Sequence, residues 1–95
     1  MKCIYAIINV TNNKHYIGSS NNIHQRWIDH KTSLQRGKHE NPYLQNAWNK
    51  YGEDKFILKI LEEIEKESDL IPIEQKYINE FGISNLYNIN PIAGK

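Results

Sequence analysis

The stretch CIYAIINVTNNKHYIGS, residues 3–19, decides the fold. Two runs rich in β-branched and aromatic residues, 3–9 and 15–19, flank the polar segment 11–13, where two asparagines follow a threonine. Asparagine tolerates the left-handed backbone conformation that a tight hairpin turn requires. The sequence therefore predicts that the chain opens with two antiparallel strands.

Two helices are predicted after the hairpin, because capping residues and glycines bound both of them. The first follows a cap at one of residues 20–22 and runs to Arg36, with Gly37 as its stop. The second covers residues 43–51 and ends at Gly52. At helical spacing, the apolar face of the first helix consists of Ile23, Trp27, His30 and Leu34.

A third strand and a last helix complete the pattern. Residues 56–61 are apolar on both sides of a strand's pleat, as expected of a central strand with both faces covered. A helix then opens at Ser68 or Asp69 and closes at Gly82. A short segment, residues 86–90, finishes the domain.

Length and composition agree with one small α/β (α+β) domain. With 95 residues, the chain can build a single core, so we expect one domain over residues 1–95, a three-stranded antiparallel sheet flanked by helices. Cys3 is the only cysteine, which excludes a disulfide framework and a cysteine-based zinc site. No apolar run approaches the ~18 residues of a membrane span, and the N-terminus lacks the apolar region of a signal peptide. We therefore expect an intracellular protein, in a bacterial or phage-infected cytoplasm or an organelle, that is not secreted and has no membrane partner.

Charge is distributed unevenly although the net charge is only +1. Residues 1–50 hold seven Lys or Arg against two Asp or Glu, and all four histidines, whereas residues 51–95 hold five against nine. A basic half can present one face to a polyanion such as DNA. Chance variation along a short chain explains the asymmetry equally well, so charge alone does not decide.

Glu74 is a carboxylate in the middle of an apolar helical face. At about 100° per residue, it shares that face with Leu70, Ile71, Tyr77, Ile78 and Phe81. Burying an ionised carboxylate costs several kcal/mol unless a cation, a metal or hydrogen-bond donors accompany it. The position of Glu74 therefore indicates a functional site.

Tyr5 and Tyr16 lie one on each strand of the hairpin. Counted back from the turn, both project from the same face of the sheet. A phenol has a pKa near 10, so it accepts a proton at neutral pH only where positive charge lowers that value. The alternative for each tyrosine is an aromatic residue that packs on the core.

Arg26 and His30 are four residues apart and share one helix face. A guanidinium at Arg26 can bind a phosphate through two parallel hydrogen bonds. The alternative is a surface ion pair with Asp29 or Glu40. For His30, the alternative is a core histidine that is hydrogen-bonded to the backbone.

Taken together, these residues fit the hydrolysis of a phosphodiester. That reaction requires a positioned water, a base, positive charge on the phosphoryl oxygens and assistance to the leaving oxygen. A site with one inward carboxylate suits a single hard cation, so we expect Mg²⁺ on Glu74, with Mn²⁺ as the alternative metal. No dinucleotide fingerprint or phosphate-cradling glycine loop is present, so no small-molecule cofactor is expected.

The chain resembles the GIY-YIG nucleases over nearly its whole length. Residues 3–5 read Cys-Ile-Tyr, where the family has Gly-Ile-Tyr, and residues 16–18 read Tyr-Ile-Gly. The substitution at Cys3 removes no catalytic group. Further similarity to the family's motifs occurs in segments 25–30, 37–39, 49–52, 73–78 and 87–89. The resemblance is greatest to the catalytic domain of phage and organelle homing endonucleases.

The resemblance implies a domain that cuts double-stranded DNA with one metal ion. It implies that Glu74 holds the metal and that Arg26 steadies the scissile phosphate. Either Tyr5 or Tyr16 would handle the proton of the attacking water, and His30 would assist or replace it as the base. From the last strand, Asn88 would orient the site by hydrogen bonds.

We expect Arg26, His39 and Lys50 to contact DNA and the isolated domain to be a monomer. Near-neutral total charge predicts weak, salt-sensitive binding. Two other classes stay open from the sequence: a DNA-binding module without chemistry, and a protein-interaction domain whose polar residues satisfy one another.

Overall fold

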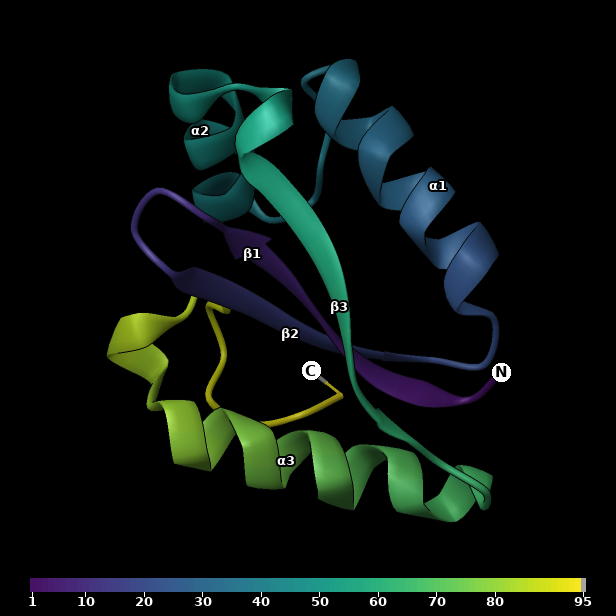
Figure 1. The fold of residues 1–95 in the computed structure, drawn as a ribbon. Helices are drawn as coiled ribbons and strands as arrows, with labels where there is room; N and C mark the ends of the chain where they lie inside the picture. Colours follow the sequence, from purple (N-terminus) through teal and green to yellow (C-terminus); the bar gives the residue numbers. More distant parts are fainter. Residues whose placement is uncertain (95) are drawn as a thin grey trace.

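Three antiparallel strands form the centre of the computed structural model, which describes residues 1–94 (Figure 1). The hairpin consists of β1 (Cys3–Asn9) and β2 (Lys14–Ser20), and β3 (Phe56–Glu63) pairs with the other side of β1. In the turn, Asn13 has a φ of 61°, the left-handed conformation expected from its sequence. The predicted hairpin and three-stranded antiparallel sheet are confirmed.

The predicted central position of the third strand is wrong. The strand order is β2-β1-β3, so β1 is central and every one of its residues is buried. β3 is an edge strand, and Ile57 on it is 48% exposed. Apolar residues on both sides of a strand indicate that both faces of the sheet are partly covered. They do not indicate whether the strand pairs with one neighbouring strand or with two.

Helices cover both faces of this sheet (Figure 1). On one face lie α1 (Ile23–Gln35) and α2 (Pro42–Tyr51), and on the other lies α3 (Leu70–Phe81). Short 3₁₀ turns at Glu53–Lys55, Glu67–Asp69 and Ile83–Asn85 join the elements. Within residues 1–94, no helix is both long and apolar enough to span a bilayer.

Two separate hydrophobic cores result from the alternation of side chains along β1. Tyr5 and Ile7 point into the core beneath α1 and α2, together with Leu34 of α1. Ile4 and Ala6 point the other way, into the core beneath α3. The central strand is thus shared by two cores that hold different parts of the molecule.

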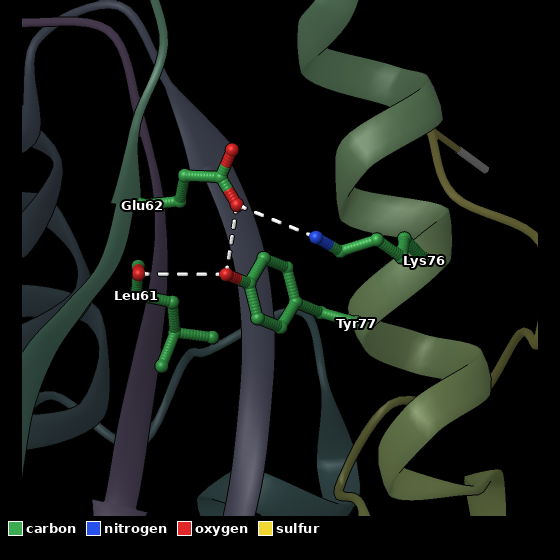
Figure 2. Close-up of polar contacts among 4 residues, drawn as sticks. All are labelled: Leu61, Glu62, Lys76 and Tyr77. Carbon is green, nitrogen blue, oxygen red and sulfur yellow. Dashed lines mark hydrogen bonds and ion pairs between the residues drawn. The ribbon is translucent and has the colours of Figure 1, made fainter.

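A hydrogen-bonded cluster fixes α3 against β3 (Figure 2). The Tyr77 hydroxyl donates to Glu62 Oε1 at 2.8 Å and lies 3.5 Å from the Leu61 carbonyl oxygen. Lys76 Nζ lies 3.6 Å from the same Glu62 oxygen. The hydrogen bond to Glu62 raises the pKa of Tyr77, because the carboxylate stabilises the protonated phenol. This cluster orients the helix that carries Glu74.

The predicted last strand does not form. Leu86 makes one isolated bridge with His15, and the Tyr87 amide donates to the His15 carbonyl at 2.7 Å. The Asn88 side chain then takes the place of a strand: its Oδ1 accepts from the Ile17 amide and its Nδ2 donates to the Ile17 carbonyl, both at 2.9 Å. Because the side chain of Asn88, and not its backbone, makes both hydrogen bonds to Ile17, residue 88 does not extend the sheet as a strand.

Replacing Asn88 with leucine is expected to destabilise the fold by about 1–3 kcal/mol, since both Ile17 backbone groups lose their partner beside a buried residue. Chemical denaturation of Asn88→Leu measures this loss. Asn90→Asp is the matched control, because the exposed Asn90 uses only an oxygen, which accepts from the Ile92 amide. An unchanged midpoint for Asn88→Leu would show that the paired amide contributes no stability.

Candidate active site

A cleft of about 490 Å³ opens at the outer edge of β2. It is lined by residues from both sides of the sheet and from the segment that follows Tyr87. Five of the six predicted catalytic residues line it: Tyr5, Tyr16, Arg26, Glu74 and Asn88. The sixth, His30, lies behind the cleft and contacts Tyr5. The structure therefore brings together residues that are far apart in the sequence.

The two halves of the cleft come from opposite faces of the sheet. Tyr5, Tyr16 and Arg26 belong to the side covered by α1 and α2, whereas Glu74 projects from α3. They meet only at the edge strand β2, where the sheet ends. Tyr5 pairs with Gly18 and Tyr16 pairs with Ile7, which places both phenols on one face, as predicted.

Gly18 allows the Tyr5 side chain to reach the cleft. A Cβ atom at this position would lie 2.5 Å from the Tyr5 hydroxyl oxygen and 2.6 Å from Cζ of the same ring. The ring therefore crosses β2 through the space that the glycine leaves open. The glycine of the Tyr-Ile-Gly motif is explained by this close approach of a side chain to the backbone.

Gly18→Ala is expected to displace Tyr5 and destabilise the fold by about 1–3 kcal/mol. On the nuclease function that the sequence predicts, it should also lower DNA cleavage by roughly 100-fold. Thermal unfolding and plasmid nicking measure the two effects. In a Tyr5→Ala background, Gly18→Ala should cost little further stability, because every close contact of the added Cβ belongs to the Tyr5 side chain, whereas cleavage should not recover. Full activity of Gly18→Ala would show that the position of the ring is unimportant.

Tyr5 begins a chain of buried and half-buried polar groups. Its hydroxyl oxygen lies 2.7 Å from His30 Nε2, and Arg26 Nε donates to it at 3.4 Å. His30 Nδ1 lies 2.8 Å from His39 Nε2. His30 is 3% exposed, and its partners are side chains, so the alternative of a core histidine bonded to the backbone is wrong.

Burial controls the ionisation of these groups. Burial, reinforced by the charge of Arg26, lowers the pKa of His30 to about 3, and burial also lowers the pKa of His39. Burial raises the pKa of Tyr5 and of Tyr16, and Arg26 offsets only part of either shift. Both histidines are therefore neutral and both phenols are protonated at pH 7 in the domain without ligand.

Arg26 presents an unpaired cation to the cleft. Within residues 1–94 it has no ion pair, so the predicted alternative of a salt bridge with Asp29 or Glu40 does not occur. Asp29 instead accepts a hydrogen bond from Gln25 at 2.9 Å. The guanidinium uses Nε on Tyr5 and lines the cleft, where an anion can bind.

Glu74 faces the cleft from α3 and is 7% exposed. Burial raises its pKa, and hydrogen bonds from the Ser19 hydroxyl and the Gly94 amide offset part of that shift. No ion pair to Glu74 is present in the described part of the chain. The Glu74 carboxylate thus has hydrogen-bond donors, but no cationic side chain of the described residues pairs with it.

The segment after Asn88 returns to α3 and forms one wall of the cleft. The Gln75 amide donates to the Pro91 carbonyl at 2.8 Å, and its oxygen accepts from the Ala93 amide at 2.7 Å. These two hydrogen bonds hold the segment 91–93 against α3 and bring Gly94 close to Glu74. Ile71, predicted on the buried face of α3, is 46% exposed and lies beside Gly94.

The residues around Glu74 fit a single hard cation. Among residues 1–94, no group of three or more His, Cys, Asp or Glu side chains gathers as a metal site. A cation on Glu74 would therefore complete its coordination with water or phosphate oxygens, which is how proteins commonly bind Mg²⁺. Mg²⁺ on Glu74 stays a prediction.

Two predicted DNA contacts lie outside the cleft. His39 adjoins a smaller hollow of about 240 Å³ between α1 and the loop that follows it. Lys50 projects from α2, where its ammonium lies 5.3 Å from the centre of the Tyr51 ring. The structure does not bring Lys50 to the phenols or to Glu74, and its contact with DNA stays a prediction.

Glu40 and Asn41 also line the cleft. From the sequence, Glu40 is named only as an alternative ion-pair partner of Arg26, and neither residue is placed at the site. Glu40 is a second carboxylate at the rim of the cleft, and it is exposed. It lies in a loop, where no helix or strand periodicity predicts which way a side chain points. Asn41 could have been predicted as the N-cap of α2, because an asparagine before a proline is typical of a helix start. Its side-chain oxygen does cap α2.

The three layers, with a cleft that gathers polar side chains at the outer edge of β2, define a small α/β domain with a candidate active site. A family model described as the GIY-YIG catalytic domain matches residues 1–88. The chain belongs to the GIY-YIG family, as the motifs of both hairpin strands predicted.

Similar proteins are homing endonucleases. The chain is 40% identical to a variant of the catalytic domain of intron endonuclease I-TevI, with a TM-score of 0.86 and coverage of 96% of each chain. A second structure of the catalytic domain of homing endonuclease I-TevI has a TM-score of 0.87 and 37% identity, over 95% of this chain and 99% of that one. These matches confirm the predicted fold class.

Two longer relatives have the same domain. A probable intron-encoded endonuclease of Neurospora crassa is 42% identical over 95% of this chain and 30% of its own length. An intron-associated endonuclease of enterobacteria phage T4 is 44% identical over 90% of this chain and 36% of its own. The chain thus spans about a third of the length of these relatives, and its similarity to the homing branch is confirmed.

Proposed function

We propose that this domain is a divalent-metal-dependent DNA endonuclease that hydrolyses one phosphodiester bond with a single metal ion. The observation that carries the proposal is the meeting of Glu74 and Arg26, from opposite faces of the sheet, in one cleft. A carboxylate for a cation and a free guanidinium for a phosphate are the two charges that phosphodiester hydrolysis needs. The endonuclease names of the relatives support the same conclusion.

In this proposal Arg26 binds the scissile phosphate. Its Nε is held by Tyr5, which fixes the plane of the guanidinium, and the remaining N–H groups are available for non-bridging oxygens. Such fixed donors stabilise the charge that develops in the transition state more than they stabilise the bound substrate.

Glu74 would hold Mg²⁺, or Mn²⁺ in its place. The bound ion would polarise the phosphate and lower the pKa of a coordinated water. Ser19 and Gly94 orient the carboxylate toward the cleft through the contacts that also limit its pKa shift. Asn88 would support the site by holding Ile17, one residue before Gly18, in place.

Tyr16 is the better placed phenol to receive the proton of the attacking water. Within residues 1–94, its hydroxyl makes no hydrogen bond to the protein, so the oxygen is free toward the cleft. Arg26 already acts to lower the pKa of Tyr16. A metal cation on Glu74 would lower it further by the same electrostatic effect.

Double-stranded DNA is the proposed substrate, acted on by a monomeric homing-endonuclease-type catalytic domain inside the cell. The net charge of +1 supplies little attraction for a polyanion, so binding by this domain should be weak, and its electrostatic part should decrease as salt rises.

Incubation of the 95-residue chain with supercoiled plasmid tests the function. Nicking that requires Mg²⁺ or Mn²⁺ and stops with a chelator supports the proposal. Binding without nicking would identify a DNA-binding module that lacks chemistry, and neither binding nor nicking would leave a protein-interaction domain. Mn²⁺ binding, followed by electron paramagnetic resonance without DNA, measures the metal site independently of cleavage.

A further inference from the structure

Residues 89–94, which we call the strap, lie between β2 and α3 and form one wall of the cleft (Figure 1). The strap follows the part of the chain that the GIY-YIG family model matches, residues 1–88. Just before it, Asn88 is fixed on β2 by two hydrogen bonds with Ile17. At its end, Gly94 lies beside Ile71 in the first turn of α3. The strap therefore connects the edge strand of the sheet to the helix that carries Glu74.

Gln75 on α3 holds the strap at two points. Its Oε1 accepts from the Ala93 amide at 2.7 Å, and its Nε2 donates to the Pro91 carbonyl at 2.8 Å. A backbone N–H can only donate and a carbonyl can only accept, so these two partners fix the orientation of the Gln75 amide. The second N–H of Nε2 donates to Asn79 Oδ1 at 2.9 Å, one turn further along the helix. Every polar atom of the Gln75 side chain therefore has a partner.

Few other contacts determine where the strap lies. Ile89 and Ile92 are 54% and 55% exposed, and Ala93 is the residue of the strap that is buried in the core beneath α3. The Ile92 amide bonds within the strap, to Asn90 Oδ1 at 2.9 Å. A segment with little apolar packing depends on its hydrogen bonds for its position. The two bonds from Gln75 are therefore a main support of the strap.

The position of the strap determines one of the donors on Glu74. The carboxylate accepts hydrogen bonds from the Gly94 amide, on the strap, and from the Ser19 hydroxyl, on β2. Both donors line the cleft together with Glu74. Gly94 is held close to α3, since a Cβ atom there would lie 3.1 Å from Ile71 Cδ1. A carboxylate has about four lone-pair positions, so two donors orient it and leave positions for a cation.

We propose that Gln75 is a positioning residue for metal binding: it docks the strap on α3, and the docked strap brings the Gly94 amide to the Glu74 carboxylate. The inference rests on the proposed function, which makes Glu74 the metal ligand. Groups that orient a metal ligand change metal affinity by about 10- to 100-fold when they are removed. Because Gln75 acts through the strap, we expect the lower end of this range.

Amide hydrogen exchange in the metal-free 95-residue chain tests whether Gln75 holds the strap. Gln75→Met keeps the length and helix propensity of the side chain but removes its hydrogen bonds. We expect the Ala93 amide to exchange roughly 10-fold faster in this variant, the effect of one lost hydrogen bond. Asn79→Ala is the matched control, because it removes the bond between Gln75 and Asn79 and leaves both bonds to the strap. Unchanged exchange at Ala93 in Gln75→Met would overturn the proposal.

Mn²⁺ titration without DNA, followed by electron paramagnetic resonance, tests the effect on the metal site. We expect the Kd of Gln75→Met to rise roughly 10-fold and that of Asn79→Ala to stay within about twofold. Chemical denaturation of both variants without metal is the parallel measurement. If the bonds from Gln75 are merely structural, the denaturation midpoint falls while the Kd of the folded chain is unchanged. That result would also overturn the proposal.

Gly94→Ala provides the test if Gln75→Met does not fold. Gly94 has a φ of 78°, which favours glycine, and the added Cβ would press on Ile71. This variant should move the amide away from Glu74 while the bonds from Gln75 remain. We expect its Kd for Mn²⁺ to rise by a similar factor of roughly 10. An unchanged Kd in Gly94→Ala would show that the strap does not orient the carboxylate.

Metal binding and cleavage separate this inference from the proposed function. If the unmodified chain binds Mn²⁺ but does not nick plasmid, the nuclease function is refuted, and a raised Kd in Gln75→Met still supports the role of Gln75. If the chain nicks plasmid and Gln75→Met has an unchanged Kd, the role of Gln75 alone is refuted. If the unmodified chain binds no Mn²⁺, both proposals fail.

Discussion

Glu74→Gln is expected to abolish plasmid nicking, with a loss of at least ~1000-fold, while the domain stays folded. The amide keeps the shape of the side chain but removes the only buried carboxylate of the cleft, and with it the several kcal/mol that a bound cation contributes to the reaction. Mn²⁺ binding should disappear together with nicking. Glu80→Gln is the matched control, because Glu80 is an exposed carboxylate on the same helix.

The same variant should be more stable than the unmodified chain at neutral pH. Because burial raises the pKa of Glu74, the unfolded chain ionises first as pH rises above about 4.5, so the folded state loses stability through that interval. Below the unfolded pKa the carboxyl is protonated in both states and the difference should vanish. Thermal unfolding of both proteins in metal-free buffer, from pH 3.5 to 7.5, measures this. Unfolding of Glu74→Gln at all pH values would show that the residue is structural.

Arg26→Ala is expected to lower kcat/KM by about 100- to 1000-fold, the usual loss for a fixed donor to a transition-state oxyanion. The variant also frees one acceptor position on Tyr5, since the bond from Nε is lost. Arg26→Lys should not restore activity, because an ammonium cannot bond Tyr5 and two phosphate oxygens in one plane.

Single-turnover cleavage at saturating DNA measures the effect of Arg26→Ala on the chemical step. Arg36→Ala is the control, because Arg36 is an exposed cation at the end of α1. Equal losses in the two variants would attribute the effect to general attraction of DNA. Undiminished cutting by Arg26→Ala would exclude the guanidinium from the mechanism.

Local signals predicted the elements and most of the site. The hairpin turn, the helix stop at Gly52 and the one at Gly82 all depend on backbone conformations that a few residue types adopt, and these positions have positive φ as expected. Glu74 was recognisable because a carboxylate interrupts an apolar helical face, and the structure buries it as predicted.

Non-local pairing was not predictable in the same way. The exchange of β1 and β3 as central strand depends on which edge of the hairpin accepts a third strand, and both strands are apolar enough for either place. The family resemblance implied a last strand at Asn88, whereas the side-chain amide of Asn88 takes the place of that strand.

The separation of the two cores has a consequence for adaptation. A change of side-chain volume in the core beneath α3, such as Ile78→Val, would shift α3 and with it Glu74, the proposed metal ligand. Arg26, the proposed phosphate ligand, would keep its position because α1 packs on the other core. Repacking around Leu34 would do the converse. On the proposed function, metal preference and nucleic-acid binding are therefore separately adjustable traits, because their side chains are supported by cores on opposite faces of one sheet.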